Sequence, residues 1–297
     1  IDECEVNNGG CDESEHCFNQ IGGAPECLFT CPGSHTATNS AQLYDLVGCE
    51  YIPGNLTITG YGIDSLLNLS SLVRVGGTFK LEDTSVETMA GLENLRSVHK
   101  LKVFESLGFQ GVENSHLVSL TGLESLESAK GGIWFETLDA LTNLDPLSNL
   151  KGSVAYVYIE WCSKLQSIEG LQGITYAGYI GSLYNYALTS LQGLHGVTET
   201  QHITIEYNGS LTDLSGLENL TKLTHGDKGL GISKTGITSL KGLDGLKSVA
   251  GKITINNNSK LASLAGLEQL ESTAGGIAIQ SNASLADISS LSGLTSI

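Results

Sequence analysis

Cysteine is the residue type with the clearest chemical potential in this sequence. Six of the seven cysteines fall within the first 49 residues, at Cys4, Cys11, Cys17, Cys27, Cys31 and Cys49. A dense cluster before a nearly cysteine-free remainder is typical of a small disulfide-stapled module beside a domain with its own core. Zinc binding is the competing interpretation, but the first spacings lack the short C-x-x-C pairs of zinc sites. We therefore expect disulfides and an oxidising compartment.

Asparagine offers a second kind of chemistry, the attachment of N-linked glycans. The sequon N-x-S/T begins at Asn55, Asn68, Asn208, Asn219, Asn257 and Asn282. A single sequon is common by chance, but this many beside clustered cysteines favour a secreted eukaryotic glycoprotein.

Catalytic residue sets are not apparent in the sequence. The histidines are scattered (His16, His35, His99, His116, His195, His202 and His225), and Cys162 lies in no catalytic signature. Pectin-degrading enzymes also use β-helices, but they need clustered aspartates with a basic partner on one stacked face. The strand-like segments here carry Thr, Ile, Tyr and Ser instead. We expect a protein that is not an enzyme.

The charge of the chain limits its partners. The net charge is −17, with Lys+Arg 15 against Asp+Glu 32. Binding to nucleic acid or to an anionic membrane requires basic surfaces, so neither is expected. No run reaches the ~18 apolar residues of a membrane span, and no signal-peptide pattern is present. Because the chain does not begin with Met, we expect a processed protein or a segment of a longer one.

A repeat of constant length determines where all of these residues lie. The central leucines of four consecutive units, Leu217, Leu243, Leu267 and Leu291, are 26, 24 and 24 residues apart. Each unit has a short alternating segment, a polar corner, and then an apolar residue at every third position. The alternation predicts a strand, and the three-residue spacing suits 3₁₀ or extended turns better than an α-helix.

The repeat predicts the fold class. One such coil cannot bury its own apolar face, whereas stacked coils form a continuous core and parallel sheets. About ten coils can be aligned between residues 54 and 297, with an insertion near 107–116. We therefore expect a mainly β protein, a right-handed β-solenoid of about ten leucine-rich coils.

The polar corner of each coil predicts a structural ladder. In leucine-rich coils the residue three positions past the last inward strand residue often turns inward and hydrogen-bonds the neighbouring coil. The ladder predicted here consists of Cys162, Asn185, Asn208, Asn258 and Asn282. Cys162 is then a buried reduced thiol, with a reactive thiol as the alternative.

The ladder also separates the sequons that should face solvent from those that should point inward. Asn257 precedes an inward residue and should face solvent, while Asn55, Asn68 and Asn219 lie between core positions. These four are the expected glycan sites. Asn208 and Asn282 are less expected, because each is both a sequon and a ladder residue.

The segment "CEYIPGNLTITGYGIDSLLNLSSLVRVGGTFKL", Cys49–Leu81, resembles the receptor L domain. This leucine-rich, β-helix-like domain occurs in insulin and epidermal growth factor receptors and in some fungal cell-wall glycoproteins. The resemblance covers roughly residues 31–297 and implies a Cys31–Cys49 disulfide in an N-terminal cap over residues 31–53. The chain has more coils than the family usually has. No second internal cysteine cap appears, which favours one continuous solenoid over two fused domains.

Residues 1–30 resemble a calcium-binding epidermal-growth-factor-like module, on the segments "IDECEVNNGGC" and "CFNQIGG". The resemblance implies disulfides Cys4–Cys17 and Cys11–Cys27, and Ca²⁺ ligands at Asp2, Glu3 and Asn19. The sequence departs from the family in lacking the first Asp of the motif, an aromatic residue before Cys27, and a final cysteine pair. The alternative is a calcium-free disulfide knot with an acidic start.

Aromatic residues gather in the fourth to sixth coils. Outward strand positions of stacked coils form a flat ladder, so Trp134, Tyr156 and Tyr158 predict an aromatic face of the kind that binds protein or carbohydrate. The alternative is core filling and stacking between coils. The insertion near 107–116 predicts a projecting loop that carries contacts, or only a bulge.

Two functions remain from different classes. The first is an extracellular structural or adhesive glycoprotein, a building block of a cell-surface, wall, matrix or filament assembly, with head-to-tail self-association at an uncapped end. The second is the ligand-binding ectodomain of a cell-surface receptor. The expected partners are proteins or carbohydrate, and the expected additions are N-linked glycans and Ca²⁺.

Overall fold

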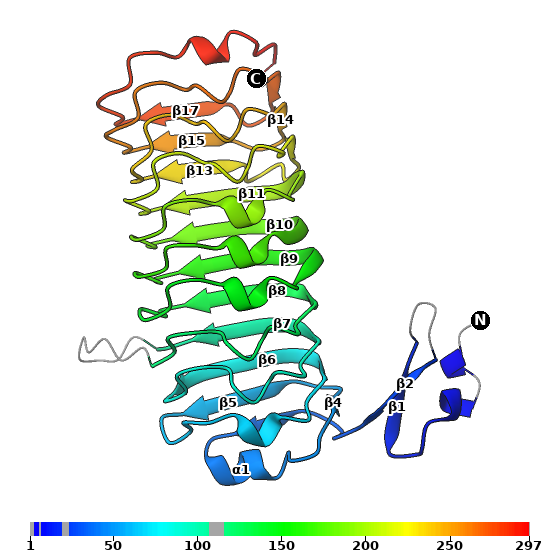
Figure 1. The fold of residues 1–297 in the computed structure, drawn as a ribbon. Coiled ribbons are helices and arrows are strands. Elements are labelled where there is room, and N and C mark those ends of the chain that lie inside the picture. The colour runs from blue at the N-terminus through cyan, green and yellow to red at the C-terminus, as the bar shows by residue number, and fades with distance from the viewer. Residues whose placement is uncertain (1–2, 6, 20–23, 107–115, 297) are drawn as a thin grey trace.

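The computed structural model describes residues 3–5, 7–19, 24–106 and 116–296. Figure 1 shows an elongated stack of coils, with a small N-terminal module beside its lower end. The module contains two 3₁₀ helices, η1 (Glu3–Glu5) and η2 (Asn7–Gly10). An antiparallel pair of strands follows, β1 (Glu15–Phe18) and β2 (Glu26–Phe29).

Three disulfides join the N-terminal cysteines. They are Cys4–Cys17, Cys11–Cys27 and Cys31–Cys49, the pairs that the two resemblances imply. The first two hold the N-terminal module together, and the third closes the first coil of the solenoid. The region before the coils is therefore disulfide-rich, as expected.

A charged contact fixes the N-terminal module against the solenoid. The Glu26 carboxylate of β2 pairs with Arg74 and Arg96, both at 2.8 Å. The Arg74 guanidinium also lies 4.6 Å from the centre of the Phe18 ring. Further along, the backbone N–H of Cys31 donates to the carbonyl of Tyr51, so the linker joins the edge of the solenoid sheet.

Parallel strands form one side of every coil and give a 15-stranded sheet. The main strands are β3 (His35–Ala37), β5 (Leu56–Gly60), β6 (Arg74–Thr84), β7 (Ser97–Phe104), β8 (Ser128–Glu136), β9 (Lys151–Glu160), β10 (Gly173–Leu183), β11 (Glu199–Glu206), β13 (Leu230–Ser233), β15 (Ile253–Asn256) and β17 (Ile277–Gln280). Four short strands lie beside them: β4 (Tyr51–Ile52), β12 (Lys222–Leu223), β14 (Ser248–Val249) and β16 (Ser272–Thr273). Each main strand pairs in parallel with the next, as stacked coils require.

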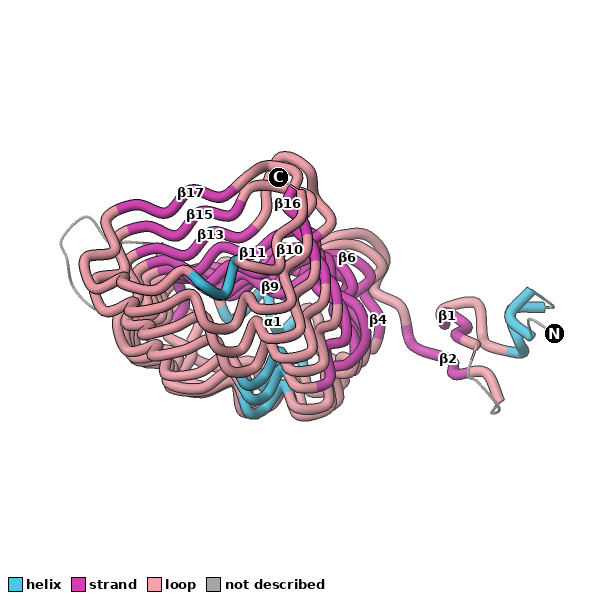
Figure 2. The backbone as a smooth tube through the Cα atoms, turned by 90° about the horizontal axis from the view of Figure 1, so that it is seen from above, coloured by secondary structure: helices cyan, strands magenta, loops and turns pink. Residues whose placement is uncertain are grey.

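Short 3₁₀ helices stack on the opposite side of the coils (Figure 2). They are η3 (Leu67–Leu69), η4 (Asp145–Leu147), η5 (Glu169–Leu171), η6 (Gln192–Leu194) and η7 (Ser289–Leu291). The three-residue spacing of the leucines thus produces the 3₁₀ geometry expected from it. The short helix α1 (Ser40–Tyr44) covers the lower end, and the Asn39 side chain caps it by accepting from the Gln42 N–H.

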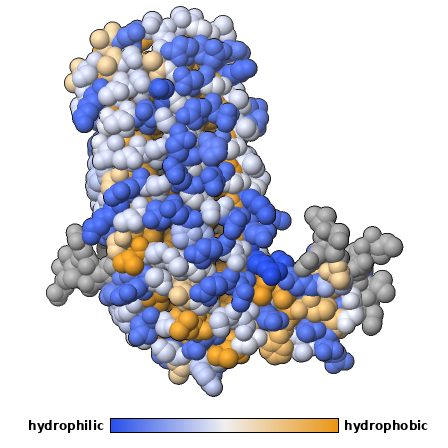
Figure 3. Space-filling model, viewed as in Figure 1, coloured by the Kyte–Doolittle hydropathy of each residue, from blue (hydrophilic) through white to orange (hydrophobic). Residues whose placement is uncertain are grey.

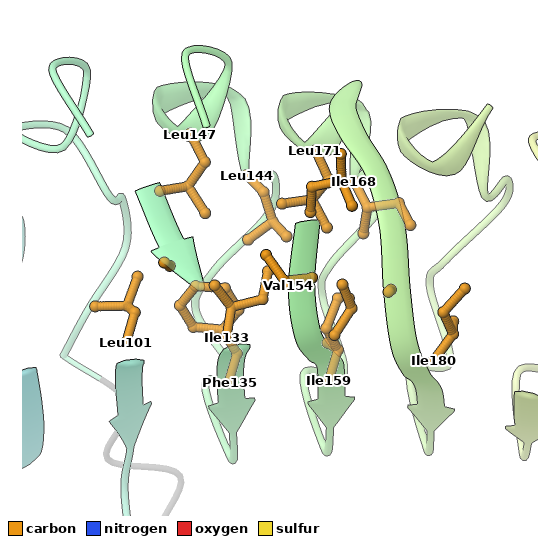
Figure 4. Close-up of a cluster of buried hydrophobic side chains, with 14 of the residues drawn as sticks. Leu101, Ile133, Phe135, Leu144, Leu147, Val154, Ile159, Ile168, Leu171 and Ile180 are labelled. Carbon is orange, nitrogen blue, oxygen red and sulfur yellow. The ribbon is translucent and has the colours of Figure 1, made fainter. Parts of the chain in front are cut away.

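The core runs unbroken through the coils. In Figure 4, Leu144, Leu147, Ile168 and Leu171 point from the turn side toward the inward residues of the strands, among them Ile133 and Phe135. All of these side chains are buried. Burial of this kind provides most of the driving force for folding. The predicted β-solenoid of about ten coils is therefore confirmed.

The face of the molecule shown in Figure 3 is mainly hydrophilic. Figure 3 shows hydrophobic residues gathered toward the lower part of the solenoid and on the N-terminal module. Val47 and Leu67, which belong to the first coils, are exposed. Within the described residues, no helix is long and apolar enough to cross a membrane.

Candidate ligand-binding face

The outer side of the main sheet carries a connected group of rings, here called the aromatic face: Trp134 on β8, Tyr156 and Tyr158 on β9, Tyr179 on β10, and His202 on β11. The centre of the Trp134 ring lies 5.1 Å from that of Tyr158 and 6.4 Å from that of Tyr156. Tyr158 lies 5.9 Å from Tyr179, which stacks on His202 at 4.2 Å. All five side chains are partly exposed, so the rings form a continuous surface across four strands.

Two outward-facing glycines make room for these rings. A Cβ at Gly132 would lie 2.8 Å from three atoms of the Tyr156 ring, so that ring rests directly on the backbone of β8. A Cβ at Gly181 would lie 2.7 Å from Tyr158 and 2.6 Å from the Tyr179 hydroxyl. An aromatic ring placed over a glycine on the neighbouring strand compensates for the missing side chain. The Tyr156 hydroxyl is enclosed and has no hydrogen-bond partner among the described residues.

Carboxylates hold two of the rings in place. Trp134 Nε1 donates to Glu136 Oε2 at 2.9 Å, and the Tyr158 hydroxyl donates to Glu160 Oε2 at 2.5 Å. Partial burial raises the pKa of Glu136, and nearby Glu160 adds to this effect. Burial and the bond to Glu160 also raise the pKa of Tyr158, so its hydroxyl remains a donor at neutral pH.

Two lysines of the preceding strand, β7, border the aromatic face. Lys102 Nζ lies 4.1 Å from the centre of the Trp134 ring, and Lys100 Nζ lies 5.2 Å from that of Tyr156. These distances are within the range of cation–π attraction. Partial burial and repulsion from Lys100 and Lys80 lower the pKa of Lys102. The side of the aromatic face toward β7 therefore carries the hydrogen-bond donors Lys100 and Lys102. The next two strands, β8 and β9, carry the acceptors Glu136 and Glu160.

His202 closes the far end of the aromatic face. Burial lowers its pKa to about 4, and the positive charge of Lys228 and the neighbouring His225 act in the same direction. Its Nδ1 atom is enclosed without a partner among the described residues, and its ring lies 5.7 Å from that of His225. His202 is thus neutral at physiological pH and serves as one more flat ring of the surface.

The structure brings the three aromatic residues singled out in the sequence into one group, and it adds Tyr179 and His202. Both additions were identifiable from strand register, because Tyr156, Tyr179 and His202 occupy equivalent positions on successive strands. A second aromatic group is not evident from the sequence pattern. Trp161, Tyr184 and Tyr207 follow three successive strands and stack on one another at the corners of their coils.

The predicted ladder residues all lie at equivalent inward positions. Cys162, Asn185, Asn208 and Asn258 are fully buried, and Asn282 on the last described coil is partly buried. The Asn185 side chain illustrates the pattern: Nδ2 donates to the Ile159 carbonyl at 2.9 Å, and Oδ1 accepts from the Cys162 N–H at 3.0 Å. Burial raises the pKa of Cys162 to about 12, so the thiol is protonated and inert. Thr235 is also buried in the ladder, next to Asn258, and was not among the predicted residues.

The sequon asparagines divide according to burial. Asn55, Asn219 and Asn257 are exposed and Asn68 is partly exposed. Asn208 Nδ2 instead donates to the Ser182 and Glu206 carbonyls, and Asn282 Nδ2 donates to the Ile255 carbonyl. Since a glycan attaches to Nδ2, these two amides, which are bonded and at least partly buried, are poor acceptors. Asn219 Nδ2 also donates, to the His195 carbonyl at 2.8 Å, but from an exposed position.

The calcium site expected near the N-terminus stays a prediction. Asp2 lies outside the described residues, and Asn19 Oδ1 accepts from the Cys4 N–H at 3.4 Å. One compact group of possible metal ligands occurs among the described residues, Cys11, Glu15 and Cys27, but its two cysteines are bonded to each other. Residues 107–115 of the predicted insertion near 107–116 also lie outside the described residues, which resume at His116.

Comparison with known proteins shows which family the first coils resemble. The receptor L domain matches residues 48–146, a third of the chain, so this part is similar to receptor L domains. A crystal structure of a TLR13–ssRNA13 complex is similar at 16% identity, over 90% of this chain and 52% of that chain, with a TM-score of 0.22. The chain thus spans about half the length of that relative. No curated protein matched the chain. A receptor L domain together with disulfides is typical of extracellular proteins.

Proposed function

We propose that this chain is an extracellular ligand-binding domain of receptor type, and that it binds its ligand on the aromatic face. The observation that carries the proposal is the continuous ring surface of Trp134, Tyr156, Tyr158 and Tyr179, held on a rigid sheet and still open to solvent. Large, fixed rings are the side chains that contribute most to binding, because they bury much area at little entropic cost.

A saccharide is the ligand class that these groups favour. Glu136 and Glu160 each use Oε2 to hold a ring, and each Oε1 has no bond among the described residues. A carboxylate fixed in this way accepts hydrogen bonds from ligand hydroxyls, and the lysine on β7 beside Trp134 donates to them. Sugar rings combine such hydroxyls with an apolar face that packs on an aromatic ring.

A glycan array compares the wild-type protein with Trp134→Ala to test the proposal. We expect binding to neutral oligosaccharides by the wild type and its loss in the variant. Tyr44→Ala is the matched control, because Tyr44 is an aromatic residue that is 70% exposed and lies on α1, away from the aromatic face. If the protein instead binds a protein ligand, and Trp134→Ala abolishes that binding, the aromatic face remains the binding surface and the ligand class changes from saccharide to protein. Binding that ignores Trp134 would refute the proposal.

A second candidate is the structural or adhesive building block. The observation in its favour is the regular stacking of coils around one continuous core, a geometry suited to extended assemblies. Electron microscopy and sedimentation of the purified protein test it: filaments support a head-to-tail polymer, and monomers at all concentrations argue against one.

A further inference from the structure

A column of stacked side chains runs along one corner of the solenoid, and is here called the corner column: Trp161, Tyr184, Tyr207 and Lys234. The Trp161 and Tyr184 rings are parallel within 4° at 4.0 Å, and the Tyr184 and Tyr207 rings are parallel within 16° at 4.2 Å. Lys234 Nζ lies 4.2 Å from the centre of the Tyr207 ring and contacts its hydroxyl. The three rings are partly exposed, so small molecules can reach the column.

The backbone locks this column in place. Trp161, Tyr184 and Tyr207 have φ of 54°, 57° and 57°, a left-handed conformation that bulky residues rarely adopt. Each is followed by a ladder residue whose side chain or backbone is hydrogen-bonded within the core. Since the ladder holds each corner, the backbones of Tyr184 and Tyr207 cannot separate without disrupting buried hydrogen bonds, and the two rings stay within reach of each other.

The two phenols have unequal acidity. The bond to the Lys234 ammonium lowers the pKa of Tyr207, whereas the pKa of Tyr184 is raised. A phenolate loses an electron more readily than a phenol, so Tyr207 is the expected point of oxidation. Trp161, stacked on Tyr184, continues the series of oxidisable rings.

From this geometry we infer that Tyr184 and Tyr207 form a site of oxidative cross-linking within one chain, with hydrogen peroxide and a haem peroxidase as the oxidising partners. Each phenol loses one electron and its hydroxyl proton to give a phenoxyl radical. One ortho carbon of each ring then forms the new carbon–carbon bond, and the ring hydrogens shift to the oxygens to restore both hydroxyls. The two electrons and two protons reduce one hydrogen peroxide to two water molecules.

Such a bond would join two adjacent coils covalently, from β10's corner to β11's. It would close a loop of residues 184–207, which includes the Asn185 corner and β11, and so restrict separation of these coils. The disulfides already imply an oxidising compartment, where peroxide and a peroxidase can reach the protein. The inference is independent of any ligand on the aromatic face.

Treatment of the purified protein with horseradish peroxidase and hydrogen peroxide tests the inference. A glutamate-specific protease separates the two tyrosines, because Glu169, Glu199, Glu206 and Glu218 bound peptides 170–199 and 207–218. We expect dityrosine fluorescence in the monomer band and a mass-spectrometric cross-link between these two peptides. The cross-link should be lost in both Tyr184→Phe and Tyr207→Phe, and kept in Tyr44→Phe and Tyr186→Phe.

A further variant tests the role of the lysine. Lys234→Ala should slow the coupling at neutral pH and approach the wild-type rate at alkaline pH, where Tyr207 ionises without help. Three results would overturn the inference: products only between chains, products spread evenly over exposed tyrosines such as Tyr44, or an unchanged product in Tyr207→Phe. Circular dichroism of each variant shows that the solenoid is intact, so a lost cross-link reports on the site itself.

Discussion

The side chain of Asn208 bonds to Ser182 on the preceding coil through both of its polar atoms. Nδ2 donates to the Ser182 carbonyl at 2.8 Å, and Oδ1 accepts from the Ser182 hydroxyl at 3.1 Å. Asn208 is fully buried, so no water replaces these bonds. The ladder therefore sets the spacing of the coils and, with it, the spacing of the rings on the outer face.

Replacing Asn208 by alanine tests this role. Asn208→Ala leaves the Ser182 carbonyl and hydroxyl without this partner, and a buried polar group left unsatisfied costs about 1–3 kcal/mol. We expect a clear fall in the denaturant midpoint. Asn94→Ala is the control, since Asn94 Nδ2 makes a similar bond to the Ser70 carbonyl but is exposed to water. Equal midpoints for the two variants would contradict the structural role of the ladder.

Glycan occupancy should follow burial at the sequons. We expect glycan on exposed Asn257 and none on Asn208, whose amide donates to two backbone carbonyls. Glycopeptide mapping of the protein secreted from a eukaryotic host measures both positions in one sample. A glycan on Asn208 would show that its side chain leaves the buried ladder before or after folding, contrary to a fixed inward position.

The repeat made much of this fold predictable. Residues such as Ile253, Ile255 and Asn258 recur at fixed offsets, so their inward positions follow from the period alone. The aromatic face was partly predictable for the same reason, because outward positions alternate with the inward ones. Tyr179 needed the register of neighbouring strands, which the alternation within one strand does not give.

Other features depend on properties that a pattern does not show. The corner column exists because Trp161, Tyr184 and Tyr207 adopt positive φ, a conformation that is rare for bulky residues and that these residue types do not indicate. The contact of Glu26 with Arg74 joins residues 48 positions apart in different modules, beyond the reach of any repeat. Gly132 leaves the space in which the Tyr156 ring packs, and this contact is visible only when the two neighbouring strands are placed side by side.

The junction between the N-terminal module and the solenoid should depend on Glu26. Glu26→Gln weakens a partly buried ion pair to Arg74 and an exposed one to Arg96, and a partly buried hydrogen bond to a charged group is worth about 1.5–3 kcal/mol. We expect the module to move more freely, which small-angle X-ray scattering detects as a larger radius of gyration. Glu127→Gln, which removes the exposed pair with Lys151, should leave the scattering unchanged. Identical scattering for Glu26→Gln and the wild type would contradict a fixed junction.

Stability should fall on mild acidification because of His202. Its pKa is lowered from 6.5 to about 4 in the folded chain, so between these values the unfolded chain binds more protons than the folded one. Stability therefore rises with pH across this window and is lost as the pH falls through it. The positive groups that oppose protonation are Lys228 and His225.

His202→Phe isolates this contribution. Phenylalanine keeps a ring against Tyr179 but does not titrate, so we expect a smaller loss of thermal stability between pH 7 and pH 5 than in the wild type. Carboxylates elsewhere titrate equally in both proteins, and the difference between the two curves reports on position 202. If the stability curves of the two proteins run parallel between pH 7 and pH 5, protonation of His202 does not reduce the free energy of unfolding.

Tryptophan fluorescence tests the central claim most directly, because the two tryptophans of the chain lie on different surfaces. Trp161→Phe leaves Trp134 on the aromatic face as the sole tryptophan, and Trp134→Phe leaves Trp161 in the corner column. Both variants are titrated with the neutral oligosaccharides of the array. Binding on the aromatic face predicts a saturable change in the emission of Trp134 and none in that of Trp161. A saturable change confined to Trp161, or no change in either variant, would contradict it.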